Sequence, residues 1–396
     1  MSPGPPSVPA GTLVPTVSVE RALAAPDRVV VDLRSPAEFA ADHVPGAVNV
    51  PLFDDVERAV IGTLYRQSSP AAAFAAGWER TREKIGSLAR EVAAAAGWEP
   101  PAADLPGLVD RMCAGGIEAL DGELAVAPAE RLGPRPVILL CWRGGLRSRS
   151  VVALLRRLGL ARAVCLAGGY RAYRRHVCTT LDTWQAPAAF VLRGLTGVGK
   201  TLVLREVERR VPGATLDLEA IAGHRSSILG MVGLKPATQK GFDSSLAARL
   251  EAGFPGWMVV EGESRKVGDV ILPPAVWGAV SGGAAIELVA PPSRRVDVLV
   301  EDYLARAENR AELAARLPFL EERLGRRKWA GVLGGLLAAG RERELVALLL
   351  EHYYDPLYRH SEGVRAYATT IDATDPAAAA ARVVAWVDAH QAIRRP

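Results

Sequence analysis

The sequence has little cysteine, no long hydrophobic run and no signal segment, and each absence argues against a class of protein. Its 396 residues contain four cysteines, none paired at the spacing of zinc or redox sites, and too few for a secreted disulfide framework. No stretch reaches the roughly 18 uninterrupted apolar residues that a membrane helix needs. The opening Met-Ser-Pro-Gly-Pro-Pro lacks the basic and apolar regions of a signal peptide. We therefore expect a cytoplasmic protein with reduced thiols, no membrane partner and no tightly bound metal or cofactor.

The composition is that of a folded chain with a mild charge. Hydrophobic residues make up 49% and charged residues 23% of the sequence, so disorder is not indicated. A length of 396 residues exceeds what one core usually supports, which predicts two domains. The net charge of +4 is small, so a polyanion such as RNA would have to meet a local basic patch. The charge balance permits RNA as a partner without requiring it.

The alternation of strands and helices predicts two α/β domains. We expect a flexible leader over residues 1–14, an N-terminal domain over 15–183, and a second domain over 187–390 with a helical insertion at about 296–365. In the first domain, an Ala-rich helical stretch over 70–130 is interrupted at Pro100, Pro101 and Pro106. In the second, apolar runs separated by helical segments predict a parallel sheet that is covered on both faces.

A glycine-rich loop opens the second domain. Residues 194–201 read Gly-Leu-Thr-Gly-Val-Gly-Lys-Thr, which matches the GxxxxGK[ST] phosphate-binding loop, between a predicted strand and a predicted helix. In such a loop the backbone N–H groups converge on an anion at a helix N-terminus, the lysine adds charge and the Thr hydroxyl can hold Mg²⁺. The residues assigned to phosphate binding are Gly194, Thr196, Gly197, Gly199, Lys200 and Thr201.

An acidic residue should accompany this loop at the end of a neighbouring strand. The segment Met-Val-Val-Glu-Gly-Glu over 258–263 supplies Glu261 and Glu263, and Glu261 is the first choice for a metal-coordinating acid. Solvated acids at a strand end remain an alternative, because acids are common there. The residues alone do not identify a nucleotide.

A second anion-binding loop follows a predicted strand in the first domain. It reads Cys-Trp-Arg-Gly-Gly-Leu-Arg-Ser over 141–148, and the following residues are helical. Cys141 lies beside Arg143 and Arg147 at a helix N-terminus, so its pKa should be lowered and part of it should be thiolate. We expect Cys141 to be a nucleophile or chalcogen carrier, and we interpret Cys113, Cys165 and Cys178 as packing residues, although Cys178 could resolve an intermediate.

Two upstream segments, residues 31–39 and 43–51, stand at the usual distance from that cysteine and together resemble the rhodanese signature. In this interpretation Asp32, Arg34 and Glu38 brace the cysteine loop, and His43 has a structural rather than a catalytic role. Asp42 stands where the family usually has glycine, which we interpret as a variation of the turn.

The order of a rhodanese domain and a phosphate-binding loop domain resembles the bacterial tRNA 2-selenouridine synthase family. The resemblance covers nearly the whole chain, from about Val29 to about Tyr358. Five further blocks carry it: residues 62–66, 217–225, 239–242, 261–268 and 353–356. Ser226 and Arg66 depart from the expected Gly and Lys, and we interpret both changes as mild.

The resemblance implies a two-step modification of wobble 2-thiouridine in tRNA. The sulfur would first receive a geranyl group from geranyl diphosphate, and selenium from selenophosphate would then displace the S-geranyl group. Cys141, Arg143 and Arg147 would serve selenium transfer, and the loop over 194–201 would hold the diphosphate. A selenophosphate-producing enzyme is an expected partner, and Mg²⁺ is compatible with the loop. The residues expected to support these loops are Asp32, Arg34, Glu219, His224, Arg225, Glu261, Glu263 and Arg265.

Other readings of the residues stay open. Cys141 and Arg147 have the C-x5-R spacing of rhodanese-like phosphatases, the second domain is laid out like a small-molecule kinase, and a non-catalytic RNA-binding module is a third alternative. A rhodanese-like sulfurtransferase fused to such a kinase would also fit. Two basic segments could contact tRNA, with aromatic neighbours for base stacking, or could be solvated helix faces. The residues concerned are Arg171, Arg174 and Arg175 with Tyr170 and Tyr173, and Arg323, Arg326, Arg327 and Lys328 with Trp329.

Overall fold

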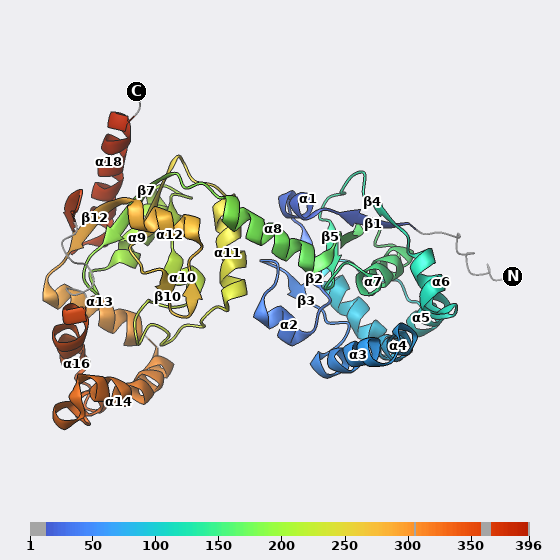
Figure 1. Cartoon of the computed structure of the whole chain (residues 1–396), viewed down its shortest axis with the longest axis horizontal. Coiled ribbons are helices and arrows are strands. Elements are labelled where there is room, and N and C mark those ends of the chain that lie inside the picture. Colours follow the sequence, from blue (N-terminus) through green and yellow to red (C-terminus); the bar gives the residue numbers. More distant parts are fainter. Residues whose placement is uncertain (1–12, 305, 358–365, 395–396) are drawn as a thin grey trace. The chain divides into compact units, whose positions relative to one another are not determined.

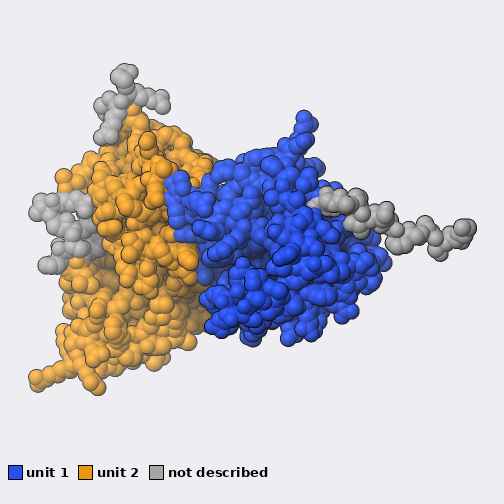
Figure 2. Space-filling model, turned by 45° about the vertical axis from the view of Figure 1, so that its right-hand side comes forward, with its two compact units in different colours: residues 1–179 blue, residues 180–396 orange. Residues whose placement is uncertain are grey.

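A computed structural model describes residues 13–304, 306–357 and 366–394. The chain divides into two compact units, residues 1–179 and 180–396 (Figure 2). Residues 1–12 of the expected leader lie outside the described residues. The expectation of a leader through residue 14 is wrong at its end, because Val14 is fully buried and begins strand β1 (Val14–Val17). Its apolar side chain enters the core, and the strand hydrogen-bonds to neighbours on both sides.

The first unit is built on a six-stranded sheet with the order β3-β2-β5-β6-β1-β4. Figure 1 labels strands β1 to β5 of this sheet. Each adjacent pair is parallel, which confirms the predicted α/β class. All four residues of β5 are buried apolar side chains, as expected of a central parallel strand. The carboxyl end of β5 leads directly to Cys141. The other strands are β2 (Val29–Asp32), β3 (Val48–Asn49), β4 (Val126–Pro128), β5 (Val137–Leu140) and β6 (Ala163–Leu166).

Four consecutive helices lie between β3 and β4 in this unit. The longest, α4 (Pro70–Ala96), begins at an N-cap Ser69 and ends at Gly97, whose φ of 60° closes the helix. The predicted break at Pro106 is wrong, because Pro106 stands in the first turn of α5, where no backbone N–H is needed. The unit's helices are α1 (Val19–Ala24), α2 (Pro36–Ala41), α3 (Asp55–Gln67), α4, α5 (Leu105–Cys113), α6 (Gly116–Glu123), α7 (Leu146–Arg157) and α8 (Gly169–Thr183), which runs into the second unit.

The second unit contains a five-stranded sheet with the order β13-β12-β7-β9-β8. All its pairs are parallel, as predicted. A short antiparallel hairpin, β10 (Lys266–Val267) and β11 (Val270–Ile271), follows β9. The strands are β7 (Ala188–Arg193), β8 (Thr215–Leu216), β9 (Trp257–Glu261), β12 (Ala284–Val289) and β13 (Thr369–Asp372), and the helices of this part are α9 (Lys200–Arg210), α10 (Leu218–Ala222), α11 (Gln239–Glu251), α12 (Pro274–Gly282) and α18 (Pro376–Arg394).

A helical segment is inserted between β12 and β13 of this sheet. It has an apolar core of its own, which includes Leu317, Leu333 and Leu345, so its helices pack mainly on one another. The segment comprises α13 (Pro292–Leu304), α14 (Ala307–Trp329), α15 (Val332–Ala338), α16 (Glu342–Leu349) and the π-helical turn η1 (Leu350–Tyr354). Residues 358–365 of the predicted insertion lie outside the described residues. Within the part of the chain that is described, no helix combines the length and apolarity needed to span a membrane.

Candidate active site

The Cys141 loop connects the end of β5 to the start of α7. Close packing requires glycine at two of its positions. A Cβ on Gly144, whose φ is 64°, would meet the carbonyl oxygen of Leu166 at 2.8 Å, and a Cβ on Gly169 would meet that of Cys141 at 2.3 Å. The loop is thus pressed against the turn before α8. The amides of Tyr170 and Arg171 donate to the carbonyls of Cys141 and Trp142, at 2.9 and 3.0 Å.

The environment of Cys141 favours its thiolate. Burial, with 2% of the residue exposed, opposes ionisation, but the charge of Arg147 and hydrogen bonds from Ser148 and the loop amides outweigh it and lower the Cys141 pKa. The Ser148 hydroxyl lies 3.2 Å from the Cys141 sulfur. The side chain of Arg143 is exposed, and its backbone amide contributes to this shift through a hydrogen bond. The loop therefore supplies a nucleophilic sulfur beside a cation, inside a set of inward-pointing donors.

A buried ion pair holds the strand next to this loop. Arg34 binds both carboxylate oxygens of Asp32, at 2.6 Å for its closest contact, and both residues are almost fully buried. The Arg34 guanidinium also stacks on the ring of Tyr170, 3.6 Å from its centroid. Because Tyr170 is hydrogen-bonded to the loop backbone, this arrangement places Asp32 and Arg34 in supporting positions.

Asp42 is more than the turn variation that the sequence led us to expect. Its carboxylate is buried, accepts a hydrogen bond from the Tyr170 hydroxyl at 2.6 Å and lies 3.6 Å from Arg174. A glycine there could make neither contact. The Nδ1 of His43 donates to the Phe39 carbonyl at 2.9 Å, and the His43 ring stacks on Phe39.

The other cysteines have different surroundings from one another. Cys165 is fully buried next to Ser148, and burial raises its pKa to about 12. Cys113 is half-buried, and burial raises its pKa to about 11. Cys178 is exposed on α8, so the interpretation of it as a packing residue is wrong. The charge of Cys141 contributes to the raised pKa of Cys165.

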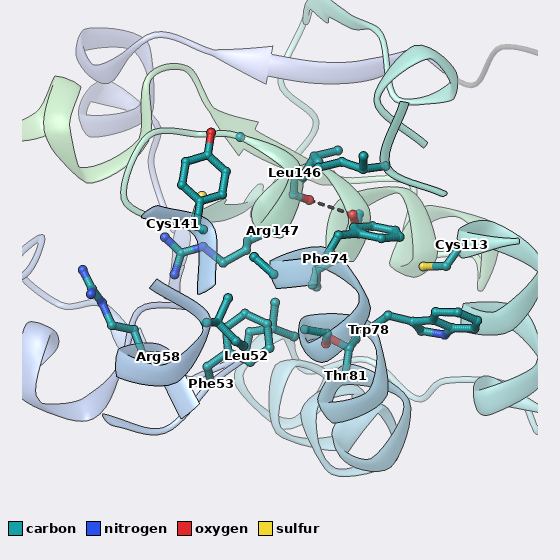
Figure 3. Close-up of a pocket in the computed structure, with 18 of the residues that line it drawn as sticks. Leu52, Phe53, Arg58, Phe74, Trp78, Thr81, Cys113, Cys141, Leu146 and Arg147 are labelled. Carbon is teal, nitrogen blue, oxygen red and sulfur yellow. Dashed lines mark hydrogen bonds between the residues drawn. The ribbon is translucent and has the colours of Figure 1, made fainter. Parts of the chain in front are cut away.

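An apolar cavity of about 670 Å³ adjoins the Cys141 loop (Figure 3). Its walls come from α3, α4, α5 and α7, and Cys141, Trp142 and Arg147 belong to its lining. The cavity could not be predicted from the sequence, because helices from separate parts of the chain create it only by packing together. One signal was present: Gly62, Tyr65 and Arg66, from a block that carried the family resemblance, line the cavity.

The phosphate-binding loop occupies the turn between β7 and α9, as predicted. Gly194, Gly197 and Gly199 have φ values of 140°, 79° and 92°, which side-chain-bearing residues rarely adopt. The Lys200 ammonium lies 3.3 Å from the Gly194 carbonyl. Thr201 follows Lys200 in the first turn of α9, and its hydroxyl faces two acidic residues.

These acids, Glu261 and Glu219, are held together at low exposure. The Thr201 hydroxyl lies 2.6 Å from Glu261 Oε1 and 3.3 Å from Glu219 Oε2. Burial and the neighbouring acids raise the pKa of Glu261 well above its usual range, and burial with the charge of Glu263 raises that of Glu219 to about 8. Glu261 is fully buried, so the alternative of a solvated strand end is wrong for it.

Arg295 on α13 braces the phosphate-binding loop, a role that nothing in its sequence surroundings predicts. Its Nε donates to the Thr196 carbonyl at 2.9 Å, while its other nitrogens bind both oxygens of Asp355 at 3.0 and 2.5 Å. Asp355 belongs to the block over 353–356 that contributed to the family resemblance. That block is therefore linked to the loop through one buried arginine.

The remaining predicted residues divide into paired and exposed groups. Arg225 pairs with Asp302 at 2.5 Å, and its guanidinium lies over the ring of Tyr303. His224 packs against Gly230 and Gly268, and burial lowers its pKa, so it is neutral at pH 7. Glu263 interacts electrostatically with Glu219 and Glu261, whereas Arg265 is exposed at the hairpin.

Two family models match different parts of the chain. Residues 187–392 match the model of the tRNA 2-selenouridine synthase AAA domain, and residues 16–93 match that of the rhodanese-like domain. The chain is 30% identical to the tRNA 2-selenouridine synthase of Chromohalobacter salexigens over 373 residues, covering 88% of this chain and 91% of the relative. The chain belongs to the tRNA 2-selenouridine synthase family. The relatives from Bordetella petrii and Cupriavidus necator are each 32% identical, covering 84% and 92% of this chain, and 87% and 95% of their own.

Two residues, Ser226 and Arg66, differ from those expected of the family. Ser226, where we expected the family's glycine, has a φ of 34°, a left-handed conformation that favours glycine. The change is therefore less mild than the sequence suggested, and it costs about 1 kcal/mol of backbone strain. Arg66 lines the cavity at the Cys141 loop, so it keeps the positive charge of the expected lysine there.

The predicted base-stacking role of the aromatic residues is wrong for both basic segments. Tyr170 and Tyr173 are each 2% exposed, and Trp329 is 5% exposed in the helical core. Burial of this kind cannot be seen in a short sequence window. Arg171, Arg175 and the basic residues over 326–328 are exposed, so their charge alone remains available to a polyanion.

Proposed function

We propose that this protein converts wobble 2-thiouridine in tRNA to 2-selenouridine through an S-geranyl intermediate. The observation that carries the proposal is the presence, in one chain of this family, of two different anion-binding loops at the ends of parallel strands. One contains a thiol with a lowered pKa and the other a lysine. Each loop is suited to one of two transfer steps.

The first step is assigned to the phosphate-binding loop. The sulfur of 2-thiouridine attacks C1 of geranyl diphosphate, the C–O bond breaks, and diphosphate leaves while a proton is released to solvent. Lys200 and the loop amides would neutralise the departing diphosphate. The oxygen donors around Thr201, with Glu219 and Glu261, fit Mg²⁺, which takes one or two carboxylates together with substrate phosphates. When bound, Mg²⁺ would neutralise phosphate charge.

The second step is assigned to the Cys141 loop. Selenium of selenophosphate attacks C2 of the S-geranyl nucleoside, the C2–S bond breaks, and geranylthiolate leaves and takes up a proton. Water then cleaves the P–Se bond, so that the products are 2-selenouridine, geranylthiol and phosphate. Arg147, Arg143 and the loop amides would hold the selenophosphate anion, and the Cys141 thiolate would steer its selenium. A selenophosphate-producing enzyme would supply this substrate.

Mass spectrometry of nucleosides tests this proposal. Purified protein is incubated with a 2-thiouridine tRNA, geranyl diphosphate and selenophosphate, and we expect S-geranyl-2-thiouridine to form and then give way to 2-selenouridine. Cys141→Ser should stop at the S-geranyl nucleoside, and Lys200→Ala should leave 2-thiouridine unmodified. Unchanged 2-thiouridine with the wild-type protein, beside turnover of a phosphate ester or ATP, would instead support the phosphatase or kinase reading.

A further inference from the structure

The cavity beside the Cys141 loop has the size and lining of a small-molecule site. Its volume of about 670 Å³ lies within the range of ligand pockets, and aliphatic and aromatic side chains form most of its wall (Figure 3). Leu52, Phe53, Phe74 and Trp78 stand among the side chains that face it in this view. Such a lining favours a hydrocarbon group over a polar one, because polar groups would lose water without gaining partners.

Charge in the lining has one sign. The charged side chains are Arg58, Arg66, Arg143 and Arg147, and no acidic side chain occurs among the described residues that line the cavity. Arg58 is engaged by Glu38 at 3.0 Å, and Arg147 lies near the Cys141 sulfur. A ligand with an apolar chain and an attached anionic group matches this combination.

We propose that the cavity holds the geranyl chain of S-geranyl-2-thiouridine while selenium displaces it. The inference rests on the proposed function, because it assigns a place to the intermediate of that reaction. The geranyl group is bonded to the sulfur on C2, and C2 must face the Cys141 loop for selenium to reach it. Cys141, Leu146 and Arg147 form part of the cavity wall. A geranyl chain bonded to the sulfur on C2 of the nucleoside would therefore enter the cavity.

Residues near the solvent side of the cavity fit the rest of such a substrate. Tyr65 lines the cavity although it is 61% exposed, so it stands where the cavity meets solvent. Arg66 and Arg143 are exposed lining residues as well. Cations at this boundary can contact tRNA phosphates while the hydrocarbon chain lies inside. The cavity also receives geranylthiol, the apolar product of the displacement.

Geranyl diphosphate has the same chain, and its diphosphate could reach these arginines. The observations favour the tRNA-bound chain, because the cavity ends at a thiol loop suited to selenium, whereas the glycine-rich loop with Lys200 suits diphosphate. The two occupants differ in the step that they serve. A test must therefore measure geranylation and selenation separately.

The first experiment measures selenation of tRNAs that carry S-methyl, S-prenyl, S-geranyl or S-farnesyl groups, using full-length protein and selenophosphate. We expect kcat/KM to rise at least about tenfold from S-methyl to S-geranyl, because each buried methylene adds binding. Conversion of all four at equal rates would overturn the cavity assignment while leaving the proposed function intact. Failure to convert any of them, with selenophosphate shown to be intact, would overturn the proposed function itself.

Two substitutions on α4 change the cavity in opposite directions. Ala73→Phe should fill it and reduce the preference for S-geranyl over S-methyl about tenfold. Phe74→Ala should enlarge it and move the preference toward S-farnesyl, a result that a folding defect would not produce. Ala75→Phe is the matched control, because Ala75 is exposed on the same helix and is not among the residues that line the cavity. The preference of this variant for S-alkyl chain length should match that of the wild type.

Geranylation of 2-thiouridine by the same variants distinguishes the two occupants. If the chain of the intermediate occupies the cavity, KM for geranyl diphosphate stays within about twofold of wild type in Phe74→Ala. The variants could instead change the chain-length preference for the diphosphate substrate and leave that for the tRNA-bound alkyl group unchanged. This result would overturn the proposal and assign the cavity to geranyl diphosphate.

Discussion

At the scale of single residues, the two arginines of the cysteine loop have different tasks. The positive charge of Arg147 lowers the pKa of Cys141. The side chain of Arg143 is exposed, and this residue acts on the thiol through a hydrogen bond from its backbone amide. The sequence places both residues beside the cysteine and does not distinguish them. Only the direction of each side chain in the folded loop separates them.

Removing the charge of Arg147 should make Cys141 less acidic. In a Cys178→Ser background, we expect Arg147→Gln to move the pH profile of iodoacetamide alkylation to higher pH, because the thiolate loses the cation that lowers its pKa. The raised pKa values of Cys113 and Cys165, about 11 and 12, keep those thiols unreactive near pH 7. Arg143→Gln is the matched control, and an equal shift in both variants would contradict the distinction between the arginines.

Glu219 should make the stability of the metal-free protein depend on pH. Its pKa is about 8 in the folded state, against 4.5 for the ordinary side chain, so the folded state binds more protons between these values. The free energy of unfolding should therefore fall as the pH rises from about 5 to about 8. Urea denaturation across this range measures the slope, and Glu219→Gln should flatten it.

Other acidic groups with shifted pKa values also contribute to the pH dependence of stability. Glu261 and Asp217 also have raised pKa values, so part of the slope should survive in Glu219→Gln. Glu208, whose pKa is lowered, should act oppositely at lower pH. A stability that rises from pH 5 to 8 in wild type would contradict the buried, protonated state of Glu219.

At the scale of elements, the helical insertion supports the phosphate-binding loop through a clamp formed by Arg295. Arg295 on α13 binds the Thr196 carbonyl and the Asp355 carboxylate, and both Arg295 and Thr196 lie beside Gly197, whose added Cβ would meet the Arg295 carbonyl at 2.8 Å. The insertion therefore contributes to the shape of a loop more than 90 residues earlier in the chain.

Breaking the clamp should weaken diphosphate binding more than it slows the reaction. We expect Arg295→Met to raise KM for geranyl diphosphate about tenfold and to lower the free energy of unfolding by about 3 kcal/mol, because Asp355 and the Thr196 carbonyl lose their partner. Steady-state geranylation and urea denaturation measure the two effects. Arg294→Met is the control, because the neighbouring Arg294 has only a long ion pair of 4.0 Å with Glu301. It should change KM for geranyl diphosphate by less than about twofold and the free energy of unfolding by less than about 1 kcal/mol.

The elements also show which structure a sequence can predict. Strands β5, β7, β9 and β12 were predictable because buried parallel strands are continuous apolar runs between turn signals. The edge strands β4 and β8 were missed, because two or three residues carry no periodicity. The lining of the cavity, the contacts of Asp42 and the Arg295 clamp were missed as well, since each depends on segments that meet only after folding.

At the scale of the whole molecule, each proposed step belongs to one of the two units. The Cys141 loop and its cavity lie within residues 1–179, and the phosphate-binding loop with its acids lies within residues 180–396. Each unit has its own apolar core, so damage to one loop should leave the other formed. Because both proposed steps modify the same nucleoside, the tRNA must bind at both loops in turn.

This division predicts complementation between two inactive proteins. Cys141→Ser should geranylate 2-thiouridine tRNA and stop, Lys200→Ala should act only on tRNA that is already geranylated, and an equimolar mixture should therefore form 2-selenouridine. We expect up to about half of the wild-type rate, because an S-geranyl tRNA made by one molecule must dissociate and bind another. The Cys141→Ser/Lys200→Ala double variant, mixed with either single variant, should form none. If the mixture fails although each single variant performs its own step on supplied substrate, the intermediate passes between the loops without leaving the molecule.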